Sequence, residues 1–215
     1  MKFTIYQASR QGGRKNNEDR VAYSYSRDAL LMVVADGMGG HLHGEIAAQI
    51  AVQTLPAYFQ KQAKPRLADP LAFLSHTITP AHYPINDYAV EQDLLEIPHT
   101  TVVAAVVQDN TAHWAHVGDS RLYLFSDGGL IARTEDHTAV AQLVRDGFIT
   151  EEEAGTHPER NKVSNCLGGY VVPQVECAVP MPLHDADTLL LCTDGIWGMV
   201  NAPELSALLH AYTLE

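Results

Sequence analysis

LLMVVADGMGGHLHGE, at residues 30–45, is the stretch that decides the fold. Its apolar run, residues 30–35, is long enough for a strand buried on both faces, and Asp36 follows where that strand ends. The glycines that come next permit tight turns and a close approach of the backbone to an ion or a phosphate. Taken alone, Asp36 is equally consistent with an aspartate that caps the following helix.

A second copy of this pattern indicates that Asp36 belongs to a functional site and is not only a helix cap. Residues 189–200, LLLCTDGIWGMV, place Asp194 at the end of another apolar run, so two neighbouring strands would present two carboxylates. A third segment, RKNNEDR at residues 14–20, gathers polar side chains in one turn: Arg14, Glu18 and Asp19. Clustered carboxylate oxygens are the ligands that hard divalent cations prefer.

Taken in order, these segments resemble the PPM family of metal-dependent protein serine/threonine phosphatases, also called type 2C, in its short bacterial form. The resemblance extends from Tyr6 to about Leu209. It implies hydrolysis of phosphoserine and phosphothreonine in proteins by a metal-activated water at a binuclear Mn²⁺ or Mg²⁺ centre. Four motifs carry it: Arg14 with Glu18 and Asp19; Asp36 with Gly37; VGDSRLY at residues 117–123; and CTDGIWG at residues 192–198.

The resemblance also implies a role for each matching residue at the metal centre. Asp36 would bridge both ions, and the backbone carbonyl of Gly37 would ligate one of them. Asp194 would ligate the ion opposite, and Glu18 would hold waters on the ions. Asp119 matches the position of a weaker third metal site in bacterial members, although a turn aspartate between two strands is an equally good reading.

Two further residues of the first motif would act without binding metal. Arg14 would bind the phosphate, because a planar bidentate donor suits paired oxygens. Asp19 is expected to orient its neighbours by hydrogen bonds. Histidines near the second motif, His41 and His43, are alternatives for proton transfer, but a histidine in a glycine loop is more often a solvated polar residue.

The fold class expected is α+β. The resemblance implies a four-layer α-β-β-α sandwich, in which two antiparallel sheets are flanked by antiparallel helices. Residues 1–215 are expected to form one domain, with a flap subdomain at about residues 136–169 beside the active site. From period and turn residues we predict these elements: strands at 2–9, 21–26, 30–35, 100–107, 111–118, 121–125 and 130–134, and helices at 44–60 and within 71–92, the first interrupted by Pro56.

Charge, hydropathy and cysteine spacing argue against several classes of protein. A net charge of −12 opposes binding to nucleic acid or to an anionic membrane, since both rest on basic surface. No apolar run approaches the roughly 20 residues that span a bilayer, and three cysteines without paired spacing indicate reduced thiols. We therefore expect a cytoplasmic protein, and we expect it to be a monomer. The resemblance implies that its partners are a phosphorylated protein substrate and an opposing serine/threonine kinase.

The end of the chain departs from the family. Relatives continue with an Asp-Asn pair that supplies another carboxylate, and then with closing strands, whereas this sequence stops at Glu215. The resemblance therefore implies a truncated chain with a missing ligand and impaired activity. The alternative is a non-catalytic phosphoprotein-binding or regulatory module that keeps the fold. The set Arg14, Glu18, Asp36 and Asp194 favours the enzyme.

Overall fold

Two antiparallel sheets form the centre of the molecule in the computed structural model, which describes residues 2–38 and 43–211. The first sheet has the order β1-β2-β5-β6-β10, with β9 also paired to β6, and the second has the order β11-β7-β8. The strands of the first sheet are β1 (Arg20–Tyr25), β2 (Ala29–Ala35), β5 (Val102–Gln108), β6 (Thr111–Val117), β9 (Glu176–Cys177) and β10 (Met181–Pro182). Those of the second are β7 (Arg121–Ser126), β8 (Gly129–Arg133) and β11 (Thr188–Cys192). A short pair, β3 (Gly37–Met38) and β4 (His99–Thr100), extends from the end of β2.

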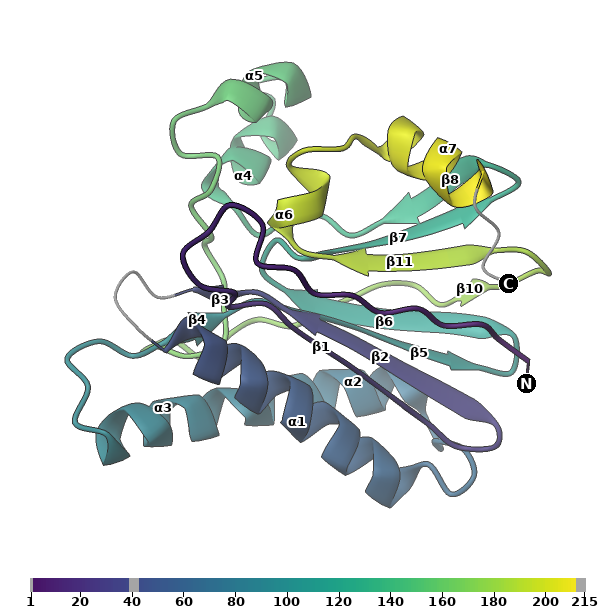
Figure 1. The fold of residues 1–215 in the computed structure, drawn as a ribbon, viewed down its shortest axis with the longest axis horizontal. Helices are drawn as coiled ribbons and strands as arrows, with labels where there is room; N and C mark the ends of the chain where they lie inside the picture. The colour runs from purple at the N-terminus through teal and green to yellow at the C-terminus, as the bar shows by residue number, and fades with distance from the viewer. Residues whose placement is uncertain (1, 39–42, 212–215) are drawn as a thin grey trace.

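Helices cover both outer faces, as Figure 1 shows. The first sheet is covered by α1 (Gly44–Gln62), α2 (Pro70–Ile78), the 3₁₀ turn η1 (Thr79–Ala81) and α3 (His82–Glu91), and the second by α7 (Ala202–Ala211). The remaining helices are short: α4 (Ala139–Arg145), α5 (Glu151–Thr156) and α6 (Asp194–Trp197). The predicted α-β-β-α sandwich is therefore confirmed.

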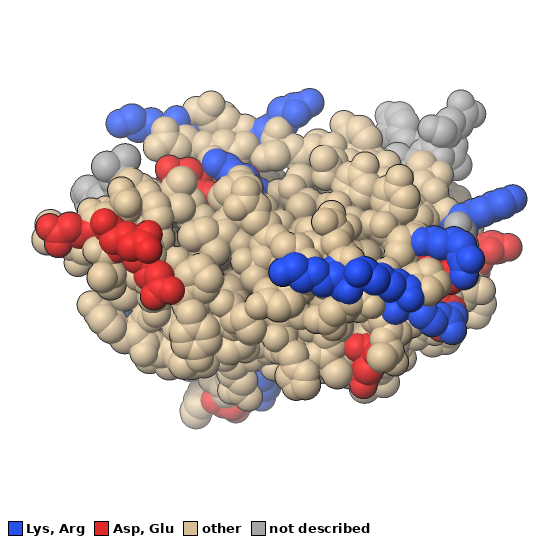
Figure 2. Space-filling view, turned by 90° about the horizontal axis from the view of Figure 1, so that it is seen from below, with Lys and Arg blue, Asp and Glu red and all other residues tan. Residues whose placement is uncertain are grey.

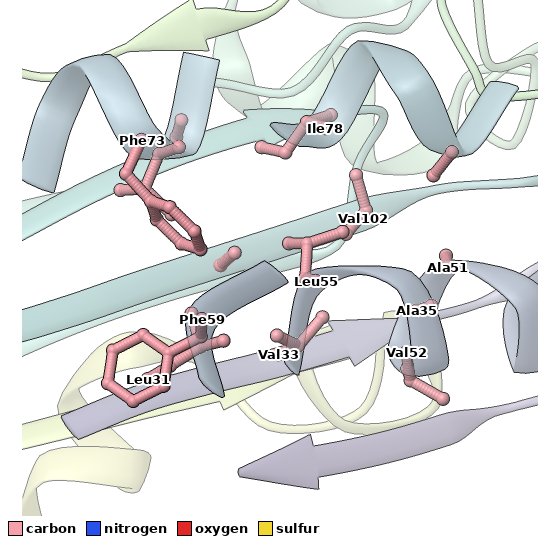
Figure 3. Packing of buried hydrophobic residues seen from close by; sticks show 14 of the residues in the cluster. Leu31, Val33, Ala35, Ala51, Val52, Leu55, Phe59, Phe73, Ile78 and Val102 are labelled. Atoms are coloured by element: carbon pink, nitrogen blue, oxygen red, sulfur yellow. The ribbon is translucent and has the colours of Figure 1, made fainter. Parts of the chain in front are cut away.

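Three apolar clusters separate the four layers. The largest joins α1 and α2 to the first sheet, and Figure 3 shows Leu55 and Phe59 of α1 facing Leu31 and Val33 of β2. The second lies between the sheets and contains Trp114, and the third lies between the second sheet and α7. Because each layer packs on the next, the strand ends on one side of the sandwich are held close together.

Figure 2 shows the outer surface of the helical layer, which is largely uncharged. Acidic side chains gather at its left end, and basic side chains lie from the middle to the right end with further acidic side chains beside them. None of the helices in residues 2–38 and 43–211 combines the length and the hydropathy that crossing a bilayer requires.

The predicted strand at residues 2–9 is wrong: those residues pair with no other strand and are mostly exposed, so no buried face specifies a register. Pro56 does not end α1, which continues to Gln62. An internal proline costs about 3 kcal/mol, and the burial of Leu55 and Phe59 on either side offsets it. The region 71–92 is two helices, α2 and α3, joined by η1 at Pro80.

Candidate active site

Asp36 lies between β2 and β3, and hydrogen bonds from Thr100 at the end of β4 and from Thr101, the next residue, hold its backbone. Its N–H donates to Oγ1 of Thr101 at 3.1 Å. Its carbonyl accepts from the N–H of Thr101 and from the hydroxyl of Thr100, both at 2.9 Å. The Thr101 hydroxyl also shares a 2.6 Å hydrogen bond with Ser120. This network fixes the main chain from which the Asp36 carboxylate projects.

Four aspartates from separate segments gather at this end of the sandwich: Asp19, Asp36, Asp119 and Asp194. Burial, and then the negative charges of Asp19, Asp194 and Asp119, together raise the pKa of Asp36 to about 8. Burial also raises the pKa of Asp119 to about 7, with contributions from Asp136 and Asp194. These carboxyl groups hold their protons because burial and neighbouring negative charges disfavour the ionised form. Divalent cations would supply a compensating positive charge, so the cluster fits a site for such ions.

The spacing of these carboxylates bears on how many ions they fit. Within residues 2–38 and 43–211, no three residues of the aspartate cluster bring one carboxylate oxygen each within 4.8 Å of one another, as one compact ion site would require. A two-metal site spreads its ligands further, because its ions are about 3.5–4 Å apart. The donors are oxygen atoms, which suit Mg²⁺ and Mn²⁺. The oxygen donors present therefore fit divalent cations.

Glu18 lies beside a close contact between the backbones of Gly37 and Gly44. A Cβ atom on Gly37 would lie 2.2 Å from the carbonyl oxygen of Gly44, and one on Gly44 would lie 2.3 Å from Oε2 of Glu18. The Gly37 N–H donates to the Glu18 carbonyl at 3.3 Å. Burial, and then the charge of Glu45, raise the pKa of Glu18. Side chains are therefore excluded where the backbone after Asp36 passes the start of α1.

Arg14 stands at the solvent-exposed rim of the site. The Gln11 side chain donates to the carbonyls of Arg14 and Lys15 at 2.9 and 2.7 Å, which closes the turn that carries the arginine. The Arg14 guanidinium lies 3.8 Å from the carboxylate of Asp194 and is 80% exposed. It can therefore contact a ligand that approaches the aspartates from solvent.

The structure also places the residues for which other readings were open. Asp19 accepts a 2.9 Å hydrogen bond from the hydroxyl of Thr193, which precedes Asp194. His43 packs edge-to-face on Tyr88 of α3, and this contact gives no support to a role in proton transfer. His41 lies outside the described residues.

His137 lies at the root of the predicted flap. Its Nδ1 accepts from the Gly118 N–H at 3.1 Å and lies 2.9 Å from Nδ2 of Asn165. Its Nε2 is therefore the protonated nitrogen, and it lies 3.2 Å from Oε2 of Glu176. Candidate ligand atoms of His116, His137 and Glu176 lie within 4.8 Å of one another, but this tautomer leaves His137 no lone pair for a metal. The group instead ties the start of residues 136–169 to the ends of β6 and β9.

Sequence reasoning missed the residues that hold the aspartates in place. Thr101 is 65 positions from Asp36, and only the pairing of strands brings the two together. Thr193 stands inside the CTDGIWG motif, so its place beside Asp194 was a usable signal. The contact of Arg121 with Asp136 and Trp197 joins three segments that nothing in the sequence links.

Comparison with known proteins identifies the family. Residues 7–214 match the family model described as "Protein phosphatase 2C". The serine/threonine phosphatase stp of Listeria monocytogenes is 36% identical over 200 residues, which are 92% of this chain and 79% of that protein.

Solved structures agree with this match. The serine/threonine phosphatase Stp1 of Staphylococcus aureus has a TM-score of 0.82 and 31% identity, covering 92% of this chain and 78% of that one. The catalytic domain of the phosphatase PstP in complex with two manganese ions has a TM-score of 0.75 and 33% identity, covering 92% and 79%. The chain belongs to the protein phosphatase 2C family of metal-dependent protein serine/threonine phosphatases.

Proposed function

We propose that this chain hydrolyses phosphoserine and phosphothreonine in proteins at the cluster of Asp19, Asp36, Asp119 and Asp194. The observation that carries the proposal is the raised pKa of Asp36, about 8, which burial and three neighbouring carboxylates produce. Such a cluster is unfavourable in a folded protein unless cations neutralise it. Membership of a family whose PstP member binds two manganese ions supports the same centre.

The chain's own residues would bind the ions and orient the substrate. Asp36, Asp194 and the Gly37 carbonyl would hold two divalent cations, with Glu18 positioned beside them by the contact between Gly37 and Gly44. Bound cations supply a water nucleophile at neutral pH and withdraw negative charge from the phosphoryl group. Arg14 would donate to two phosphoryl oxygens from the rim of the site.

The identity and number of the ions are finer proposals. We propose Mn²⁺ or Mg²⁺, since the donors are oxygen atoms. We also propose a third, weaker ion at Asp119. That residue is 6% exposed, and its pKa is raised to about 7, which supports a cation that neutralises it.

Partners and domain layout extend the proposal. A phosphoprotein substrate requires a kinase to phosphorylate it, so an opposing serine/threonine kinase is the expected partner of this chain. The chain itself is proposed to act as a monomer. Residues 1–215 would form one domain, in which residues 136–169 act as a flap. The helices α4 and α5 of that segment pack on each other beyond the end of the second sheet, which supports a separate small unit (Figure 1).

The test is phosphate release from a phosphothreonine peptide with Mn²⁺ and with EDTA. We expect activity that requires Mn²⁺ and is lost in Asp36→Asn. The matched control is Asp127→Asn, which makes the same charge change in the exposed turn between β7 and β8. No Mn²⁺-dependent release by the folded parent protein would overturn the proposal.

A further inference from the structure

Asp194 is carried by a helix too short to be stable alone. The helix α6 contains four residues, and no side chain caps its N-terminus. One turn fixes several backbone dihedrals for few hydrogen bonds, so it forms only where tertiary contacts hold it. The turn is also compact, because a Cβ atom on Gly198 would lie 2.7 Å from the Asp194 carbonyl oxygen. The direction of the Asp194 carboxylate therefore depends on what holds α6.

Contacts at both ends hold this helix, in addition to the packing of Trp197 on the third apolar cluster. Before Asp194, the Thr193 hydroxyl donates to Asp19 at 2.9 Å, which links α6 to the motif at residues 14–20. At the other end, the Trp197 ring lies under the Arg121 guanidinium, whose central carbon is 3.7 Å from the ring centroid. A cation placed over a partly desolvated indole ring is attracted to it by about 1–2 kcal/mol.

Arg121 is itself fixed in place. Its Nε and one terminal nitrogen donate to the two oxygens of Asp136 at 2.8 and 2.7 Å, and its other terminal nitrogen donates to the Tyr123 hydroxyl at 3.0 Å. The Arg121 and Asp136 side chains are 15% and 13% exposed. A bidentate ion pair of this kind holds the plane of the guanidinium, and so the surface on which Trp197 lies.

Arg121 therefore joins three parts of the site. It stands two residues after Asp119, it binds Asp136 at the start of residues 136–169, and it holds Trp197 three residues after Asp194. We propose that Arg121 and Trp197 are positioning residues that hold α6 so that Asp194 faces the other aspartates and binds the ions. This inference rests on the proposed metal centre and deepens it.

The test measures Mn²⁺ binding by isothermal titration calorimetry, without substrate. Trp197→Leu keeps apolar bulk but loses the aromatic face, whereas Trp197→Phe keeps a ring on which the guanidinium can lie. We expect the Mn²⁺ dissociation constant to rise about tenfold or more in the leucine variant and less than about threefold in the phenylalanine variant. Met199→Leu, an exposed position two residues beyond Trp197, is the matched control and should bind as the parent does.

Kinetics separate positioning from general damage. If Asp194 is only misdirected, Trp197→Leu should recover most of its kcat at saturating Mn²⁺ while needing more Mn²⁺ for half-activation. A parent protein that binds no Mn²⁺ would overturn both the metal centre and this inference. A leucine variant that binds Mn²⁺ as tightly as the parent, or a phenylalanine variant as weak as the leucine variant, would overturn the inference alone.

A second measurement does not depend on variants of the α6 segment. The sequence contains two tryptophans, so Trp114→Phe leaves Trp197 as the only one. We expect Mn²⁺ to change its fluorescence with the same dissociation constant that calorimetry gives. Emission that does not respond while Mn²⁺ binds would count against a link between Trp197 and the ions.

Discussion

Replacing Asp36 with asparagine should stabilise the metal-free protein, although the same change removes a proposed ligand. Without metal, burial and then the charges of Asp19, Asp194 and Asp119 raise the pKa of Asp36 from 3.8 to about 8. The folded protein therefore holds this proton more tightly than the unfolded chain does. The stability that protonation of Asp36 contributes to the folded state is fully present below pH 3.8 and is lost as the pH rises to about 8.

The size of the effect follows from that pKa. Between the pKa of Asp36 in the unfolded chain and pH 7 there are about three pH units. The free energy of unfolding of the metal-free protein falls by about 1.4 kcal/mol over each of them, or by roughly 4 kcal/mol in all. Asparagine has nearly the shape of the protonated acid and does not ionise, so Asp36→Asn should recover about 2–4 kcal/mol. For a chain of 215 residues this corresponds to a rise in Tm of about 4–16 °C.

The assay is thermal unfolding followed by circular dichroism, first in excess EDTA and then with Mn²⁺. In EDTA the variant should have the higher Tm, and the Tm of the parent should fall as the pH rises from 4 towards 8. With Mn²⁺ the order should reverse, because an ion that binds only the folded state stabilises the parent by mass action. Asp127→Asn, in the exposed turn after β7, should behave as the parent does in both conditions.

Two results would refute the reasoning. One is a variant that is less stable than the parent in EDTA near neutral pH. The other is a parent whose stability in EDTA does not change between acid and neutral pH, since the aspartate cluster would then carry no repulsion for Mn²⁺ to relieve.

Three further substitutions test other parts of the site. Arg14→Ala should raise the KM for a phosphopeptide about tenfold and change Tm by less than about 1 °C, because this side chain is exposed; equal KM values would exclude phosphate binding. Gly37→Ala should lower the free energy of unfolding, measured in urea, by about 2–4 kcal/mol, because the new Cβ would lie 2.2 Å from the Gly44 carbonyl oxygen. The control Gly155→Ala places a Cβ where no atom lies within 4 Å, and it should cost nothing. Thr101→Val should cost about 1–3 kcal/mol and Thr101→Ser much less, because serine keeps the oxygen that accepts the Asp36 N–H; similar losses in both would contradict that role.

The strand tips that carry chemistry could be predicted from the sequence, because each combines a buried apolar run with an abrupt polar end. The residues 30–35 and 189–192 both form strands. Asp36 follows the first directly, and Asp194 follows the second after Thr193. Helix capping is also encoded locally: Thr150 and Glu153, three residues apart, form a capping box at the start of α5.

Features that depend on distant partners could not be predicted. Phe3 and Ile5 alternate like a strand, but pairing also requires a partner edge, and none pairs with them in the described chain. Pro56 is a helix breaker by its local chemistry, yet the apolar face of α1 carries the helix past it. The stacking of Arg121 on Trp197 spans 76 positions, and no local pattern encodes it.

Asp36 and Asp194 are placed by strands of different sheets. Asp36 follows β2 of the first sheet, and Asp194 follows β11 of the second. A cation held by both would act as a reversible cross-link between the sheets, much as a disulfide joins two strands. Metal supply would then govern the mechanical strength of the sandwich, and amide hydrogens beside Ala35 and Cys192 would exchange with deuterium more slowly whenever the link is in place.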